Sequence, residues 1–197
     1  MTDGSTVILD SGTALNIKYT PDLRCLQLVT GEIYIETAPD TAVRHRPFVV
    51  DTQEGRVRAL GTRFSVSQQA DYSQVAVFAN KVEIQPSSPN ALKPIVRTGQ
   101  ETRFISARVE PIQQNKLDRP PWSEGVIIAD NIPLSEFLLQ LNRYRKGYVT
   151  CAPEIADMRI IGSFPLKDTD RILASLETNL PVKLSNPFPY WVKVLPR

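Results

Sequence analysis

The sequence predicts a mainly β chain whose last part is a small α+β domain, because the spacing of its apolar residues changes once. Apolar and polar residues alternate from residue 5 to about 112, as they do in half-buried strands. Residues 113–121 are polar and end in a proline pair, which cannot continue a strand ladder. Helical spacing of apolar residues then takes over. We therefore expect an all-β domain at 1–112, a linker at 113–121, and a domain at 122–197 made of two β-α-β units plus a terminal strand.

The first half is expected to contain many short strands in a sandwich- or solenoid-like arrangement. Leu15, Ile17 and Tyr19 alternate with polar neighbours, and successive strand side chains point to opposite faces. Turn residues, among them Thr30-Gly31 and Pro86 to Asn90, interrupt the runs at intervals of roughly 8–12 residues, which is typical of such folds. The expected strands cover 15–19, 23–29, 31–36, 47–52, 56–60, 62–68, 75–79, 82–84, 94–97 and 101–110.

The second half is expected to run strand, helix, strand twice over. Pro133 suits the first position of a helix, and apolar residues follow it at i, i+3, i+4 and i+7 spacings from Leu134 to Tyr144. Gly147 can provide a left-handed cap after this helix. The expected strands cover 126–129, 148–151, 158–164, 182–184 and 190–195, and the second helix begins after Asp168 or Asp170.

Charge and composition exclude some functions. The net charge is +2 with 23 basic and 21 acidic residues, and no basic cluster is dense enough to indicate nucleic-acid binding. No run approaches the length of a membrane-spanning helix, and no signal peptide is visible, so the sequence reads as a cytosolic protein or as a piece of a larger one. Cys25 and Cys151 fall in different expected domains, and both are interpreted as small buried side chains rather than a disulfide.

No pattern indicates catalysis, a cofactor or a metal. The single histidine, His45, lies between two arginines in a polar segment, without a neighbouring nucleophile or a second metal-ligating group. Phosphate-cradling glycine loops and nucleophile elbows are absent from the sequence. We therefore expect a non-enzymatic protein with no cofactor. Trp122 is expected to anchor the linker to the second domain.

A series of motifs follows one another along the chain: Leu9 to Leu15, Gly31 to Ile35, Arg46 to Thr52, Leu60 to Val66, Val75 to Ile84, Thr98 to Gln100, Trp122 with Gly125, Asn131 to Leu134, Leu141 to Tyr144 and Ile161 to Phe164. Taken together and in this order, they resemble the FecR family. Asn80 stands where that family's hairpin usually has a glycine, and asparagine tolerates the positive φ of such a turn. The resemblance covers nearly all of residues 5–195, and its second part is similar to the short domain at the N-termini of secretins and TonB-dependent transporters (STN-like).

The resemblance implies a function that composition and spacing alone do not. Proteins of this family are single-span inner-membrane regulators whose cytoplasmic segment binds an extracytoplasmic-function sigma factor. Their periplasmic part receives a signal from the N-terminal signalling domain of a TonB-dependent outer-membrane siderophore transporter. This sequence contains neither the cytoplasmic segment nor the transmembrane helix, so it is expected to be the periplasmic part alone.

A sensor of this kind needs a surface at which a partner binds, and the second domain offers a sheet edge or a helix face. The expected partner-binding residues lie at the end of the first helix and on the last strand: Asn142, Arg143, Tyr144, Arg145, Tyr190, Trp191, Val192, Lys193 and Val194. Two alternatives stay open. Aromatic residues on a concave β face would favour a cell-wall or glycan-binding module, and carboxylates clustered in a pocket would favour an enzyme.

Overall fold

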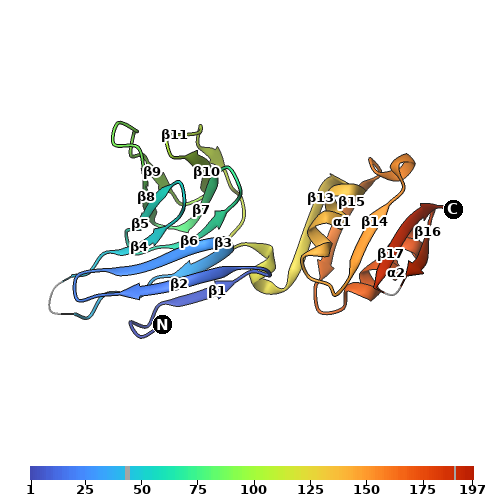
Figure 1. Cartoon of the computed structure of the whole chain (residues 1–197), viewed down its shortest axis with the longest axis horizontal. Coiled ribbons are helices and arrows are strands. Elements are labelled where there is room, and N and C mark those ends of the chain that lie inside the picture. Colours follow the sequence, from blue (N-terminus) through green and yellow to red (C-terminus); the bar gives the residue numbers. More distant parts are fainter. Residues whose placement is uncertain (43–44, 189) are drawn as a thin grey trace. The chain divides into compact units, whose positions relative to one another are not determined.

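The structure, a computed structural model, describes residues 1–42, 45–188 and 190–197. The chain divides into two compact units, Met1–Ser123 and Glu124–Arg197, and each unit has its own hydrophobic core. Figure 1 shows strands alone in the first unit and both helices in the second. The expected fold class, an all-β part followed by a small α+β part, is confirmed.

Within the described residues, the first unit is a twelve-stranded sheet that folds back on itself. Strand order along its main path is β11-β10-β7-β6-β3-β4-β5-β8-β9, and β1, β2 and β12 pair with strands of that path. The strands are β1 (Thr6–Leu9), β2 (Ala14–Tyr19), β3 (Arg24–Glu36), β4 (Phe48–Asp51), β5 (Gly55–Ala59), β6 (Arg63–Gln68), β7 (Ser73–Ala79), β8 (Lys81–Pro86), β9 (Ile95–Arg97), β10 (Gln100–Ile105), β11 (Arg108–Val109) and β12 (Gln113–Gln114).

Strand β3 joins the two layers of this sandwich. Its first half pairs with β2 and β4, and its second half pairs with β1 and β6. The expected turn at Thr30-Gly31 is wrong, because both residues continue the strand. Gly31 has φ +87°, and a Cβ there would lie 2.6 Å from the Cα of Thr13. The glycine therefore lets the strand change partners without a break.

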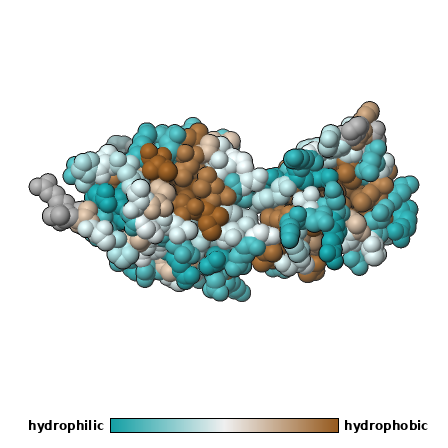
Figure 2. Space-filling view, turned by 90° about the horizontal axis from the view of Figure 1, so that it is seen from below, coloured by the Kyte–Doolittle hydropathy of each residue, from teal (hydrophilic) through white to brown (hydrophobic). Residues whose placement is uncertain are grey.

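Alternate residues of both layers form the first core, which includes Leu26, Ile33, Phe64, Val77 and Ile84. The sandwich is closed where β9 contacts β7 and β10. The opposite side is formed by the outer strands β1 and β2, each of which, among the residues that the structure describes, pairs with β3 alone. There Leu9 and Ile17 are 48% and 58% exposed, and Figure 2, seen from the side on which β1 and β2 lie, shows an apolar patch over this unit.

The segment predicted as a linker belongs structurally to the first unit. Gln113 and Gln114 pair with β10, and the 3₁₀ turn η1 (Pro121–Glu124) carries Trp122 onto a small cluster on the outer face of the sheet. That cluster contains Tyr34, Ala76 and Phe78. The expectation that Trp122 anchors to the second domain is therefore wrong, because its contacts are with the first unit.

The second unit follows the expected order of elements: β13 (Val126–Pro133), α1 (Leu134–Asn142), β14 (Tyr148–Cys151), η2 (Pro153–Ile155), β15 (Arg159–Pro165), α2 (Thr169–Asn179), β16 (Val182–Phe188) and β17 (Trp191–Pro196). The two β-α-β units interleave, because β13 pairs with β15 whereas β14 pairs with β17. In the described part of the unit, β17 is the central strand of the sheet β14-β17-β16.

Both helices bury one apolar face in the second core. Leu134, Phe137, Leu138 and Leu141 of α1 are buried, as are the three residues Ile172, Leu173 and Leu176 of α2. Asp168 is the N-cap of α2, as expected, and its Oδ1 accepts a hydrogen bond of 3.0 Å from the backbone N–H of Arg171. Pro133 precedes the first residue of α1 and occupies the N-cap position instead of the expected first helical position.

Candidate partner-binding site

The end of helix α1 is tied to strand β14 by one asparagine. The Nδ2 of Asn142 donates to the carbonyl of Val149 over 2.9 Å, and the N–H of Val149 donates to Oδ1 of Asn142 over 2.7 Å. The side chain of Asn142 thus binds both the N–H and the carbonyl of Val149, as the backbone of a neighbouring strand would. The short connection between them, residues 143–147, is thereby held beside the start of β17.

Gly147 allows the start of β17 to approach this connection closely. Its φ is +93°, and a Cβ at this position would lie 2.0 Å from the carbonyl oxygen of Tyr190. The same carbonyl accepts a hydrogen bond of 2.7 Å from the N–H of Tyr148. Only glycine therefore fits at position 147, because a side chain there would collide with the carbonyl of Tyr190.

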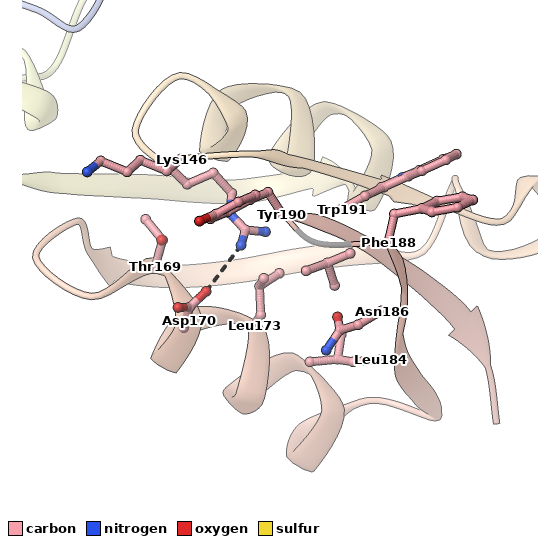
Figure 3. A pocket seen from close by; sticks show the side chains of 11 residues that line it. Lys146, Thr169, Asp170, Leu173, Leu184, Asn186, Phe188, Tyr190 and Trp191 are labelled. Carbon is pink, nitrogen blue, oxygen red and sulfur yellow. Dashed lines mark hydrogen bonds and ion pairs between the residues drawn. The ribbon is translucent and has the colours of Figure 1, made fainter.

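These contacts bring two distant parts of the chain to one cleft of about 770 Å³. Figure 3 shows its aromatic residues on one side and the N-terminal part of α2 on the other. We call it the Arg145 cleft. Its lining residues are Arg145, Lys146, Thr169, Asp170, Leu173, Leu184, Asn186, Phe188, Tyr190, Trp191 and Val192.

Three exposed aromatic residues, Phe188, Tyr190 and Trp191, line one side of the cleft, and we call this surface the aromatic ledge. The rings of Phe188 and Trp191 stack, with centroids 5.6 Å apart and an angle of 16° between their planes, and Figure 3 shows them side by side. Trp191 also donates from Nε1 to Oγ1 of Thr150 over 3.3 Å. Tyr190 is 76% exposed and has φ +65°. Exposed aromatic residues held in fixed positions are typical of protein-binding surfaces.

The polar part of the cleft is centred on Arg145. Its side chain is only 7% exposed, and Nη2 lies 3.1 Å from Oδ1 of Asp170, the ion pair drawn as a dashed line in Figure 3. Asp170 itself is 84% exposed in its side chain, so water screens this pair. Among the described residues, Nε and Nη1 of Arg145 have no hydrogen-bond partner.

The structure brings four of the nine expected partner-binding residues to this cleft: Arg145, Tyr190, Trp191 and Val192. The others lie elsewhere. Asn142 is occupied by its bonds to Val149, Tyr144 packs against the second core, and Val194 is fully buried in that core. Arg143 is the C-cap of α1, and Lys193 pairs with Thr150 and Ser185 in the sheet.

Sequence reasoning missed the part of the cleft that comes from α2 and β16. Thr169, Asp170 and Leu173 lie near the start of α2, while Leu184 and Asn186 are on β16. Their place beside Arg145 depends on which strands pair, and the interleaved pairing leaves no local pattern in the sequence. A signal was available only from Phe188, whose aromatic cluster with Tyr190 and Trp191 stands out.

Other kinds of site find no support in the described part of the chain. Residues 1–42, 45–188 and 190–197 contain no group of three or more metal-ligating side chains, and no helix among them is long and apolar enough to cross a membrane. His45 is exposed. Both cysteines are free, and burial together with the neighbouring carboxylate of Asp51 raises the pKa of the Cys25 thiol to about 11.

Comparisons with known proteins agree with this fold. Two crystal structures of a proposed anti-sigma factor from Parabacteroides distasonis ATCC 8503, at 1.65 Å and 2.50 Å resolution, are similar with TM-scores of 0.74 and 0.73 at 19% sequence identity. The similarity covers 99% of this chain and 92% and 91% of those chains. No curated protein matches the sequence.

The family comparison concerns the first unit. Residues 1–83, from β1 to the start of β8, match the family model described as FecR protein. This range contains the resembling segments from Leu9 to Glu83, including most of the β7–β8 hairpin in which Asn80 has φ +60°. The resembling segments of the second unit lie outside the match. Over these residues, which are less than half of the chain, the sequence is similar to the FecR protein family.

Proposed function

We propose that this chain is the periplasmic sensor region of an inner-membrane regulator of an extracytoplasmic-function sigma factor. The match of residues 1–83 to the FecR family carries the proposal. The likeness in fold to a proposed anti-sigma factor over 99% of the chain supports it. In this role the chain has no catalytic residues, and its signal is the binding of another protein.

The proposed partner is the N-terminal signalling domain of a TonB-dependent outer-membrane siderophore transporter. The Arg145 cleft is the docking site we favour, because it combines an exposed aromatic ledge with a buried cation. The second unit is then the STN-like domain that receives the partner, and the first unit relays the signal toward the membrane. The sigma factor binds a cytoplasmic segment of the same regulator.

Strand addition is a less suitable mode of docking on the last strand. β17 already has neighbours on both sides, β14 and β16, so its backbone groups are paired within the sheet. A partner at this place must contact side chains instead. Tyr190 and Trp191 offer them at the surface, 76% and 38% exposed.

A glycan-binding module is less well supported. Such a module would use aromatic residues on the β unit. In the described part of the first unit, the exposed large hydrophobic residues are all aliphatic. They are Met1, Leu9, Ile17, Val29, Leu60, Leu92, Ile95, Ile112 and Leu117.

The test is a binding titration of this chain against a panel of signalling domains from transporters of the same genome. We expect one domain to bind, and Tyr190→Ala to weaken that binding by about tenfold or more, as truncation of an interface hot spot does. Ile161→Ala is the matched control, since Ile161 is 73% exposed in the same unit but lies outside the cleft. It should change the affinity less than about twofold.

Two results would contradict the proposal at different levels. Binding of every tested domain at background level would oppose the transporter as partner. Full binding after removal of residues 124–197 would leave the partner in place and move the docking site to the first unit.

A further inference from the structure

The buried guanidinium of Arg145 is incompletely satisfied. Its side chain is 93% buried, because 7% is exposed, and of its three nitrogens only Nη2 is paired, with Asp170. Nε and Nη1 are buried without a hydrogen-bond partner among the described residues. Buried polar groups in folded proteins are nearly always paired, so an exception indicates a missing partner. A guanidinium needs an acceptor, and the best acceptor for its planar fork is a carboxylate or a phosphate.

The surroundings of Arg145 favour an anion attached to a polypeptide. Lys146 adds a second cation to the cleft, while Asp170 supplies its one carboxylate among the lining residues. Leu173, Leu184 and the stacked rings of Phe188 and Trp191 provide apolar surface next to this positive end. A free inorganic anion makes no use of such a surface, whereas an acidic residue with an apolar neighbour covers both parts.

We propose that the Arg145 cleft binds the side-chain carboxylate of an aspartate or glutamate that is followed or preceded by an apolar residue in the docked protein. The carboxylate pairs with Arg145, and the apolar residue lies on the ledge of Phe188, Tyr190 and Trp191. Asp170 holds Arg145 in the free protein and competes with the incoming carboxylate for it. This assignment rests on the proposed function and states the chemistry by which the partner is recognised.

The direct probe is a pair of capped dipeptides, acetyl-Phe-Asp-amide and acetyl-Phe-Asn-amide, titrated into the full chain. The two peptides have the same shape and differ in one charge. The readout is the NMR signal of the Arg145 Nε–H, which changes when a carboxylate hydrogen-bonds to that guanidinium. We expect the acidic peptide to shift this signal at a concentration about tenfold lower than the amide peptide does, since charge-assisted pairs are the stronger ones. Equal shifts by both peptides would overturn the proposal.

Two variants test the roles of Asp170 and Arg145 separately. Asp170→Asn removes the competing carboxylate at an exposed position, so it should tighten binding of the acidic peptide about threefold without unfolding the chain. Arg145→Gln should abolish the preference for the acidic peptide. Arg171→Gln is the control, because it removes an equal charge from an exposed position of α2 outside the cleft. Weaker binding by Asp170→Asn would overturn the proposed competition and with it the site.

Inorganic phosphate is the third ligand to be titrated into the full chain. If phosphate shifts the Arg145 signal at the same concentration as the acidic peptide, the cleft binds anions in general and the proposal fails. The outcomes also separate this inference from the proposed function. A signalling domain that binds Arg145→Gln as tightly as the wild type contradicts the carboxylate but leaves the transporter as partner. Selectivity for the acidic peptide without binding of any signalling domain supports the carboxylate and opposes the transporter.

Discussion

At the scale of single residues, the first unit depends on a buried ion pair at its N-terminus. Asp3 Oδ2 lies 2.9 Å from Arg24 Nη1, and the two side chains are 2% and 5% exposed. Arg24 also donates from Nε to the carbonyl of Arg46 and from Nη1 to that of Ala38. The pair thus fastens the N-terminal residues to the sandwich, and removing one partner leaves a buried charge without compensation.

Replacing Asp3 by asparagine should therefore lower the free energy of unfolding of the first unit by about 3 kcal/mol at neutral pH. Asp22→Asn, at an exposed position, should lower it by less than about 0.5 kcal/mol. Urea denaturation monitored by fluorescence measures both. Equal effects of the two variants would contradict a structural role for the Asp3–Arg24 pair.

The same pair predicts a dependence on pH. Burial opposes ionisation of Asp3, but hydrogen bonds from Ser5 and Arg24 outweigh it and lower the pKa of the carboxyl. An unfolded aspartate has a pKa of about 3.9, so the stabilisation is present above about pH 4 and is lost as the pH falls through the folded value. Melting temperatures of wild type and Asp3→Asn should converge between pH 5 and the acid limit. A difference that stays constant down to about pH 2 would contradict this linkage.

At the scale of elements, local patterns in the sequence predicted most strands and both helices, because burial of alternate or i, i+4 residues is a local property. Local patterns could not predict the features that depend on which strands pair with one another. Thr30-Gly31 resembles a turn, yet Gly31 lies in a strand that changes partners. Val194 resembles a surface residue of a last strand, yet that strand is central and its side chain is fully buried.

The Arg145 cleft likewise could not be predicted from local patterns in the sequence. Arg145 and the aromatic cluster at 188–191 are visible in the sequence as separate features. Their meeting depends on the parallel pairing of β14 with β17 and on Gly147, which lets Tyr190 approach. Both are contacts between distant segments, so no local pattern contains them.

Gly147→Ala should therefore damage both the second unit and its cleft. A side chain at φ +93° is strained by about 1–3 kcal/mol, and the clash with the Tyr190 carbonyl adds to this. Gly125→Ala is the matched control, since Gly125 also has positive φ, +73°, but no atom within 4 Å of the added Cβ. We expect Gly147→Ala to be the more destabilising in urea and to lose binding of the acidic dipeptide. Equal stability of the two alanine variants would show that the Tyr190 contact does not determine the position of this connection.

At the scale of the whole molecule, two cores imply two separate unfolding transitions. The first core contains residues only of the first unit and the second only of the second. The two tryptophans of the chain fall one in each unit, Trp122 on the outer face of the first sheet and Trp191 on the ledge of the cleft. Each therefore reports on one unit.

The segment around Trp122 belongs to the first unit, because its side chains contact residues of that unit. Besides the contact of Trp122 with Tyr34 and Phe78, Arg119 lies 3.6 Å from Glu36 and 5.7 Å from the centre of the Tyr34 ring. A fragment of residues 1–123 should exceed a fragment of residues 1–112 in stability by about 2–3 kcal/mol, because the shorter one exposes this cluster to water. Urea midpoints of the two fragments measure the difference, and equal midpoints would show that residues 113–123 do not stabilise the unit.

In the full chain, a Trp191→Phe background leaves Trp122 as the reporter of the first unit, and a Trp122→Phe background leaves Trp191 for the second. Asp3→Asn should lower the urea midpoint only in the first background, because its contacts lie entirely within that unit. Gly147→Ala should lower it only in the second, since the clash it creates is with Tyr190. Stability changes at sites without shared contacts are normally independent, so each substitution should leave the other transition unchanged. If either substitution shifted both transitions equally, the prediction of two separate unfolding transitions would be wrong.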